Sequence, residues 1–346
     1  FLTTPLMKIN LSENSKIYLV CPANFATGGT EGIHQLAFKL QKLGFPRVFL
    51  FYLNTTQDNP VHPQFEKYQI KYITKIDDEI DHLLIVPEIH TSLLYKYKHL
   101  QKAIWWLSVD NFLISKRLNS SIYYKIKSLI IKKKLILPKR LFSFREKATE
   151  KIHHFYQSEF AREFLIKNGV DQRLWSLSDY LNVSFNQRKF SESKRKNQIV
   201  YNPKKGIEFT QKLISLRPDW SWVPIENMSP QEVGDLLGES KVYIDFGNHP
   251  GKDRLPREAA VSGCCIVTGR QGSAGNSIDI PIADKYKFDE KHTSFESILS
   301  QIDHLLKNYS EAILDFDTYR SKIREDEKIF EDCIKQIFEF SSTNPK

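Results

Sequence analysis

The chain has 346 residues, 41% of them hydrophobic, and this length favours two globular domains over one. Fifty Lys and Arg against 41 Asp and Glu give a net charge of +9, which indicates anionic partners without distinguishing nucleic acid, a membrane surface and phosphorylated small molecules. No run approaches the roughly 20 uninterrupted apolar residues of a membrane-spanning helix and no signal peptide is recognisable, so we expect a soluble or peripherally attached protein.

Short apolar runs alternate with amphipathic stretches from Lys16 onward, which is typical of strands and helices in a parallel sheet. In the first half, helices are predicted at 32–44 and 158–169. Strands are predicted at 16–22, 47–53, 68–73, 82–87, 102–109 and 152–157, with one more after the second helix. We assign residues 7–185 to one α/β domain and the polar stretch 186–197 to a linker.

The same alternation restarts in the second half of the chain. Ser229, Pro230 and Glu232 form a capping box that begins one helix, and another begins near Pro256 and ends at Gly263. Strands are predicted at 198–202, 221–226, 241–246 and 264–268, with a first helix at 205–216. Strands joined by such short crossovers predict a right-handed parallel sheet in a second domain, residues 198–317. We predict a C-terminal amphipathic helix in residues 318–346. Whether this helix packs back toward the first domain is left open by the sequence.

The cysteines are interpreted as reduced core residues of a cytoplasmic protein. They form no C-x-x-C pair and have no His beside them at metal-ligand spacing. The four positions are Cys21, Cys264, Cys265 and Cys333.

Ligands of open parallel sheets bind beyond the carboxyl ends of the strands, where helix N-termini favour anions. The first such loop, Phe25 to Gly32, has Gly28 and Gly29, which could offer amides to a phosphate or a sugar hydroxyl. It matches neither the G-x-G-x-x-G fingerprint nor a P-loop, and a simple tight turn is the alternative.

Two lysines, Lys204 and Lys205, follow the first strand of the second domain. Cations at a helix N-terminus oppose the helix dipole, so this pair favours a bound diphosphate, with a solvated pair as the alternative. A third loop, 247–260, combines glycines and basic side chains before a Pro-started helix. There Asn248, Lys252 and Arg254 are predicted to contact phosphates or sugar, and Glu258 to accept hydrogen bonds from ribose, unless the composition is coincidental.

Three segments together resemble the retaining GT-B glycosyltransferases of the GT4 type: Gly28 to Glu31, Lys204 to Gly206, and Arg257 to Val267. In layout the likeness covers residues 16–340. It implies two Rossmann-like domains facing an interdomain cleft, with the nucleotide sugar held mainly by the second.

The resemblance also implies residue roles. Glu258 occupies the place of the ribose-binding Glu, and Lys204 or Lys205 that of the phosphate-binding basic residue. The nucleotide base is expected near 225–227, with Glu226 among its contacts. The family commonly has a second Glu eight residues before the ribose-binding one, where this chain has Pro250; Asp253 or His249 is the candidate substitute, and the stereochemical outcome stays open.

Acid–base candidates follow two strands of the first domain: Glu88 and His90 after one, Asp110 after the next. An inverting transfer needs one of them as general base toward the acceptor hydroxyl, whereas a retaining transfer relies more on positioning. Each has a plain alternative as a helix N-cap or a loop hydrogen-bonding group. No metal is expected, because the D-x-D sequence at 315–317 lies in a helical context and is interpreted as surface charge.

The segment 125–147 interleaves Lys and Arg with apolar residues, and Glu146 is the acidic residue within it. Such a stretch suits an anionic membrane surface at the inner face of a membrane, or a phosphorylated acceptor, and a solvated helix face is the alternative.

The leading interpretation is a glycosyltransferase acting on a glycan or lipid-linked acceptor in cell-surface polysaccharide or glycoconjugate synthesis. A nucleotide-sugar epimerase of the same fold and a noncatalytic protein that binds anionic surfaces are the alternatives. No nucleic-acid-binding module is recognisable, so nucleic acid is not an expected partner.

Overall fold

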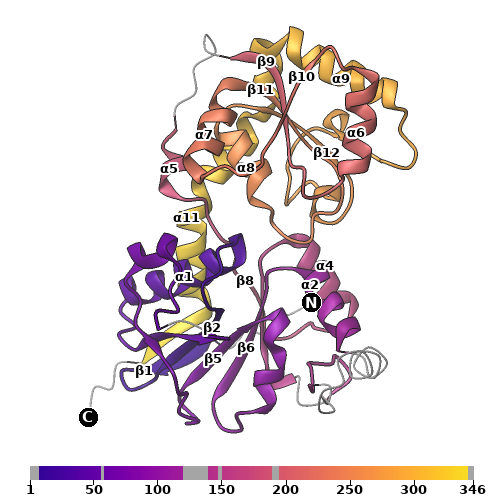
Figure 1. Ribbon diagram of the computed structural model, residues 1–346. Helices are drawn as coiled ribbons and strands as arrows, with labels where there is room; N and C mark the ends of the chain where they lie inside the picture. The colour runs from indigo at the N-terminus through magenta and orange to yellow at the C-terminus, as the bar shows by residue number, and fades with distance from the viewer. Residues whose placement is uncertain (1–7, 56–57, 120–138, 147–149, 189–194, 342–346) are drawn as a thin grey trace. The chain divides into compact units, whose positions relative to one another are not determined.

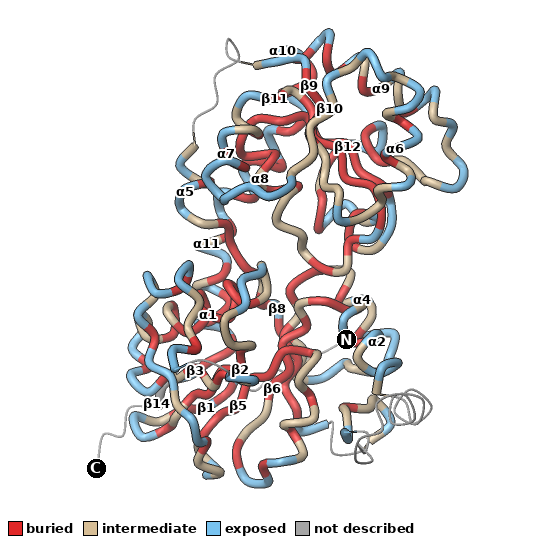
Figure 2. Tube along the Cα trace, viewed as in Figure 1, coloured by how far each residue is buried: buried red, intermediate tan, exposed pale blue. Residues whose placement is uncertain are grey.

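The structure is a computed structural model that describes residues 8–55, 58–119, 139–146, 150–188 and 195–341. The chain divides into two compact units, the first formed by Phe1–Asp179 with Ile329–Lys346 and the second by Tyr180–Lys328. Each unit contains a parallel sheet with mostly buried strands (Figure 1, Figure 2).

The first unit has a seven-stranded parallel sheet in the order β4-β3-β2-β5-β6-β7-β8. All of β5 is buried, as expected for a parallel strand covered on both faces. The strands are β2 (Ile17–Pro22), β3 (Val48–Leu53), β4 (Tyr72–Ile73), β5 (Leu83–Pro87), β6 (Gln101–Trp106), β7 (His153–Tyr156) and β8 (Leu174–Ser176). The helices are α1 (Gly28–Lys42), α2 (Val109–Leu118) and α4 (Glu159–Lys167), with 3-10 helices η1 (Pro63–Tyr68) and η2 (Glu88–Tyr95).

The second unit has a five-stranded parallel sheet in the order β10-β9-β11-β12-β13. Its strands are β9 (Lys196–Tyr201), β10 (Ser221–Pro224), β11 (Ser240–Asp245), β12 (Cys265–Gly269) and β13 (Lys287–Phe288). Its helices are α5 (Val183–Asn186), α6 (Ile207–Leu216), α7 (Pro230–Glu239), α8 (Arg254–Val261), α9 (Phe295–Lys307) and α10 (Tyr309–Ala312). Short 3-10 helices complete it: η5 (Ser273–Gly275), η6 (Asp284–Tyr286) and η7 (Ile313–Phe316).

The capping box predicted for α7 is confirmed. Glu232 donates its backbone N–H to Ser229 Oγ at 3.3 Å, and Glu232 Oε2 accepts the Ser229 N–H at 2.7 Å. Val233 and Leu237 are buried on the inner face of this helix. The sequence therefore determines both where the helix begins and which face it buries.

Helix α11 (Asp317–Ile337) begins in the second unit and ends in the first. Phe330, on its last turns, stacks against Trp105 with 6.4 Å between ring centroids, and Glu331 accepts a hydrogen bond from Lys39 Nζ at 2.5 Å. The chain then forms β14 (Phe338–Ser341), which pairs in parallel with β1 (Ile9–Ser12). The C-terminal segment thus packs within the first unit.

The unit boundary lies at Asp179 and not at 185, because Leu181 and Phe185 are buried in the core of the second unit. The predicted linker 186–197 extended too far toward the C-terminus, because β9 already begins at Lys196. Part of that stretch, 189–194, lies outside the described residues.

Two further predictions are corrected by the structure. A strand at 68–73 was too long, because Pro63–Tyr68 forms η1 and only Tyr72–Ile73 pairs with the sheet. The loop around Gly28 and Gly29 is shorter than expected. Thr27 caps α1 by accepting the Thr30 N–H at 3.4 Å, so both glycines belong to the first turn of the helix.

All four cysteines are free and buried, as predicted for core residues. Within the described ranges, no helix combines the length and the apolar character that crossing a membrane requires.

Candidate functional site

Three loops meet at the carboxyl edge of the second sheet through close backbone contacts at glycines. Gly206 (φ +59°) begins α6, and a Cβ there would collide with the carbonyl oxygen of Phe246. Gly272 (φ +63°) follows β12, and a Cβ there would collide with the carbonyl oxygen of His249. Only glycine combines these positive φ angles with such contacts, so the loops after β9, β11 and β12 are brought together at this edge.

The helices α6 and α8 both begin at this edge, and neither has a side-chain hydrogen bond at its N-cap. In contrast, α1, α2, α4, α7 and α9 are each capped by a Ser or Thr side chain. Uncapped N-terminal N–H groups, together with the positive end of the helix dipole, are suited to binding an anion.

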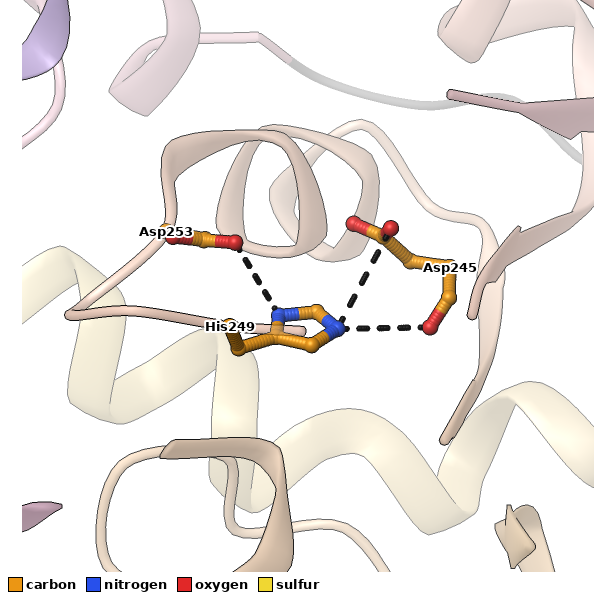
Figure 3. A group of neighbouring side chains, drawn as sticks. All are labelled: Asp245, His249 and Asp253. Carbon is orange, nitrogen blue, oxygen red and sulfur yellow. Dashed lines mark hydrogen bonds and ion pairs between the residues drawn. The ribbon is translucent and has the colours of Figure 1, made fainter. Parts of the chain in front are cut away.

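A charged cluster lies at this edge, in which Asp245 and His249 are buried and Asp253 is partly buried (Figure 3). Lys205, also partly buried, contacts all three. Lys205 Nζ donates to Asp253 Oδ2 at 2.5 Å, lies 3.1 Å from His249 Nδ1 and lies 3.3 Å from Asp245 Oδ1. His249 Nε2 is 3.3 Å from the backbone oxygen of Asp245, which can only accept. His249 Nε2 can donate to this oxygen, and His249 Nδ1 lies 3.1 Å from Asp253 Oδ2 as well as 3.1 Å from Lys205 Nζ.

Burial and pairing affect the two carboxyls differently. Burial raises the pKa of Asp245, although His249 and Lys205 oppose this. Burial acts in the same direction on Asp253, but hydrogen bonds from His249 and Lys205 outweigh it and lower the pKa of this carboxyl. Asp245 also accepts a hydrogen bond from Tyr243 at 2.8 Å, which holds its carboxyl in place.

Asp245, His249 and Asp253 offer ligand atoms within 4.8 Å of one another, a spacing that a metal ion could use. The ammonium of Lys205 lies within 3.3 Å of an atom of each of them. This side chain therefore supplies the positive charge of the cluster, and a metal would have to displace it.

The basic side chains of the loop after β11 have partners within the second unit. Lys252 Nζ donates to Asp326 at 2.8 Å, and Arg254 donates to the carbonyl oxygen of Tyr180 at 3.2 Å. To contact a phosphate as predicted, each of these two side chains would have to leave its present partner. Lys204, in contrast, is exposed on the loop after β9.

Two residues of this edge were not predicted. Arg257 is fully buried, donates to the backbone oxygens of Asp253 and Lys252 and pairs with Asp326 at 3.3 Å, so it orders the loop. Glu290 follows β13 and accepts the Gly247 N–H at 2.7 Å. No sequence signal distinguished either residue. Arg257 has the pattern of an ordinary helix residue, and the strand before Glu290, β13, has only two residues and was not predicted.

The remaining residues predicted to contact the donor follow strands of the second sheet and so lie at the same edge. Glu258 is half-buried on α8, Asn248 is exposed on the loop after β11, and Glu226 is exposed after β10. Glu226 lies close enough to Tyr201 to contribute, after burial, to the raised pKa of that phenol. The structure thus brings the loops of all predicted donor-binding residues of the second unit to one sheet edge.

In the first unit, Glu88 and Asp110 follow the adjacent strands β5 and β6. Glu88 is 2% exposed and accepts the Leu107 N–H at 3.0 Å. Burial, only partly opposed by backbone hydrogen bonds, raises its pKa to about 7. This carboxyl is therefore ready to give or take a proton near neutral pH.

The other two acid–base candidates have different environments. Burial lowers the pKa of His90 to about 4, and its Nε2 has no hydrogen-bond partner among the described residues. Asp110 is in the first turn of α2, where Ser108 and not Asp110 serves as the N-cap. In the D-x-D sequence, Asp315 pairs with Lys285 at 2.7 Å and Asp317 pairs with Arg320, so both side chains are occupied by neighbouring cations.

Only part of the predicted cationic segment 125–147 lies within the described residues. There Arg140 pairs with Glu146 at 2.7 Å and its guanidinium lies over the ring of Tyr95, 4.1 Å from the centroid. The lysines at 125, 127, 132–134 and 147 lie outside the described residues.

No protein-family model matches the sequence, and no curated protein is similar enough to count as a match. Among solved structures, the sucrose-phosphate synthase of Thermosynechococcus elongatus aligns with a TM-score of 0.62 at 10% identity, over 93% of this chain and 98% of that one. Anabaena HepE, solved in complex with UDP-glucose, aligns at 0.54 and 10% identity over 92% and 98% of the two chains. WaaG, a glycosyltransferase involved in lipopolysaccharide biosynthesis, aligns with a TM-score of 0.53 and 9% identity. The alignment covers 91% of this chain and 98% of WaaG. The chain therefore has the GT-B fold, with two Rossmann-like domains.

Proposed function

We propose that this chain is a glycosyltransferase that moves a sugar from a nucleotide-sugar donor to a glycan or lipid-linked acceptor, in the synthesis of a cell-surface polysaccharide or glycoconjugate. The main supporting observation is the pair of uncapped helix N-termini, α6 and α8, at the glycine-packed carboxyl edge of the second sheet. The positive ends of two helix dipoles at one sheet edge suit a diphosphate. The fold shared with WaaG and HepE gives independent support.

Within this proposal the two lysines have different roles. Lys205 already contacts Asp245, His249 and Asp253 and orders the loop, so it reaches a phosphate only by giving up one of these contacts. Lys204 is exposed and supplies the mobile positive charge for the diphosphate. Glu258 binds the ribose hydroxyls and Glu226 contacts the base.

Glu88 is the proposed proton acceptor toward the acceptor hydroxyl if the transfer inverts the anomeric centre. Its pKa of about 7 suits this role, because a base with a pKa near ambient pH combines sufficient ionisation with sufficient basicity. If the transfer retains the configuration, Glu88 and His90 position the acceptor and the leaving phosphate receives the proton. We also propose that transfer needs no metal, because Lys205 neutralises Asp245 and Asp253 and Lys204 supplies the positive charge for the diphosphate.

The donor is tested by thermal unfolding of the full chain with UDP, GDP, CMP and dTDP, each with and without EDTA. One nucleotide is expected to raise the unfolding temperature, with or without the chelator. Glu258→Ala should weaken its binding at least 10-fold, while Glu311→Ala, a change at an exposed Glu on α10, should leave it unchanged. Equal affinities for both variants would refute the ribose assignment.

The reaction class is tested with the sugar conjugate of the nucleotide that binds. A glycosyltransferase is expected to release free nucleotide faster when a suitable acceptor is added. An epimerase would change the sugar while leaving it attached to the nucleotide, which sugar analysis of the recovered donor would detect. If none of the four nucleotides binds, the proposal loses its basis.

A further inference from the structure

A cavity of about 550 Å³ lies at the amino-terminal edge of the sheet of the first unit, on the opposite edge from Glu88. Gln101 and Lys102 begin β6, His153 begins β7, and Arg173 directly precedes β8. Because β6 has six residues, the two edges are about 20 Å apart. A volume of this size is typical of sites for small ligands.

The cavity is lined by basic groups whose acidic neighbours already have partners. Lys98, His99, Lys102, Lys151, His153 and Arg173 line it, and the acidic residue among its lining residues is Glu146. Glu146 is paired with Arg140 at 2.7 Å and accepts a hydrogen bond from Tyr95 at 3.2 Å. The nearby carboxylate of Asp78 accepts the backbone N–H groups of Lys98, His99 and Leu100 at 2.8, 2.9 and 3.2 Å. Positive charge in the lining therefore exceeds negative charge.

Two hydrogen-bond donors face one another in this lining. Trp175 Nε1 lies 3.2 Å from His153 Nδ1, and since an indole nitrogen only donates, Nδ1 must accept. The proton of the neutral imidazole is then on Nε2, which lies 3.2 Å from Nη1 of Arg173. A guanidinium also only donates, so this contact joins two N–H groups with no acceptor between them. Burial and the charge of Arg173 lower the pKa of His153 to about 4, which keeps the imidazole neutral.

The backbone holds Arg173 in an uncommon conformation beside this contact. Its φ is +53°, in the left-handed region that disfavours residues with a Cβ. Its carbonyl oxygen accepts the His154 N–H at 2.8 Å, and its Nη1 donates to the carbonyl oxygen of Lys151 at 3.2 Å. The guanidinium is thus anchored at the cavity wall by a strained residue, as is common at binding sites.

We propose that this cavity is a second binding site, in which one oxyanion group of a small ligand is held between Arg173 and His153 Nε2. An oxygen there accepts from both donors and removes the unfavourable N–H to N–H contact. Lys151 and Lys102 add positive charge around it, and the remaining volume takes the body of the ligand. A phosphate and a carboxylate have the same acceptor chemistry, so the group is defined as an oxyanion and its source by experiment. This site is independent of the proposed donor site in the second unit.

The test is calorimetric titration of the full chain, saturated with UDP to occupy any donor site, with inorganic phosphate, glucose 6-phosphate, glucuronate and uncharged glucose. At least one of the three anions is expected to bind and glucose is not. Tighter binding of glucose 6-phosphate indicates a phosphorylated ligand, and tighter binding of glucuronate indicates a carboxylated one. Binding of glucose with equal affinity, or of no anion, would overturn the proposal.

Variants connect the binding to the named residues. Arg173→Gln should weaken anion binding at least 10-fold, and Arg117→Gln, at an exposed position on α2, should leave it unchanged. Because Arg173 also contacts the backbone, Lys151→Gln serves as a second variant that keeps the Lys151 carbonyl, with an expected loss of about 3-fold. The imidazole signals of His153 in NMR spectra should shift on anion binding to the wild type. Unchanged affinity in both cavity variants would place the anion elsewhere and contradict the assignment.

Discussion

Burial of Glu88 links the stability of the first unit to pH. A carboxyl with a folded-state pKa of about 7, against an ordinary value of 4.5, keeps its proton in the folded chain when the unfolded chain has lost it. The stability that this proton confers is complete below pH 4.5 and is lost as the pH rises to about 7. Glu88→Gln removes the titration, so the difference in free energy of unfolding between wild type and variant should change by roughly 3 kcal/mol between pH 4 and pH 8.

Urea unfolding at several pH values measures this difference, and contributions from other groups cancel between the two proteins. Glu311→Gln, at an exposed position, should run parallel to the wild type throughout. A constant difference between wild type and Glu88→Gln would show that the carboxyl titrates normally and would remove it as a neutral-pH base.

The two adjacent lysines of the loop after β9 should separate stability from binding. Lys205→Met leaves Asp245 and Asp253 without their shared cation, and breaking such a largely buried pair costs about 3 kcal/mol of stability. Lys204→Met changes an exposed side chain, so its effect on stability should stay within about 0.5 kcal/mol, while nucleotide affinity should fall about 10-fold. Chemical unfolding and nucleotide titration of both variants test this. The reverse pattern would assign the phosphate contact to Lys205.

At the scale of elements, the glycine contacts that join three loops should be sensitive to one methyl group. Gly206→Ala introduces a Cβ against the carbonyl oxygen of Phe246, so we expect a loss of more than 2 kcal/mol and weaker nucleotide binding. Gly44→Ala is the matched control, because its φ is also positive (+97°) but nothing lies within 4 Å of the added Cβ. Gly44→Ala should lower the free energy of unfolding by only about 1 to 2 kcal/mol, the cost of the backbone strain. Equal losses in urea unfolding would mean that the loops can move apart.

Most strands and helices of this chain could be predicted, because their apolar residues repeat with a clear period and their ends have strong local signals. The helix α7 has Ser229 and Glu232 at one end, and α8 is followed by Gly263 as predicted but begins at Arg254, two residues before the predicted start at Pro256. In contrast, β14 and β1 become strands only through pairing between the two ends of the chain, and β13 has two residues. No local pattern records such long-range pairing.

The predicted site shows the same division. Which loops meet follows from the parallel sheet, and glycines at Gly206 and Gly247 mark the close approaches. Which charges are available for a ligand depends on partners far away in sequence. Asp326, on α11, pairs with Lys252 from 74 residues further along the chain, and no spacing rule predicts that contact.

At the scale of the whole molecule, the chain crosses between its two units twice, once after Asp179 and once within α11. The second crossing returns the C-terminus to the first unit, where Phe330 is fully buried against Trp105 and Phe338 packs against Phe155. The stability of the first unit therefore depends on residues that follow the second unit in sequence.

Phe330→Ala tests this dependence. Removing a fully buried aromatic ring should lower the free energy of unfolding of the first unit by about 3 to 4 kcal/mol. Its neighbour Ile329 is 45% exposed, so Ile329→Ala, on the same helix turn, should cost less than about 1 kcal/mol. Hydrogen exchange followed by mass spectrometry resolves the units: amides of β2, β5 and β6 should lose protection in Phe330→Ala, while those of β9, β11 and β12 should keep theirs, because the two units have separate hydrophobic cores. Equal loss of protection in both units would mean that they unfold as one cooperative body, and no loss in either would mean that the C-terminal segment contributes little to the first unit.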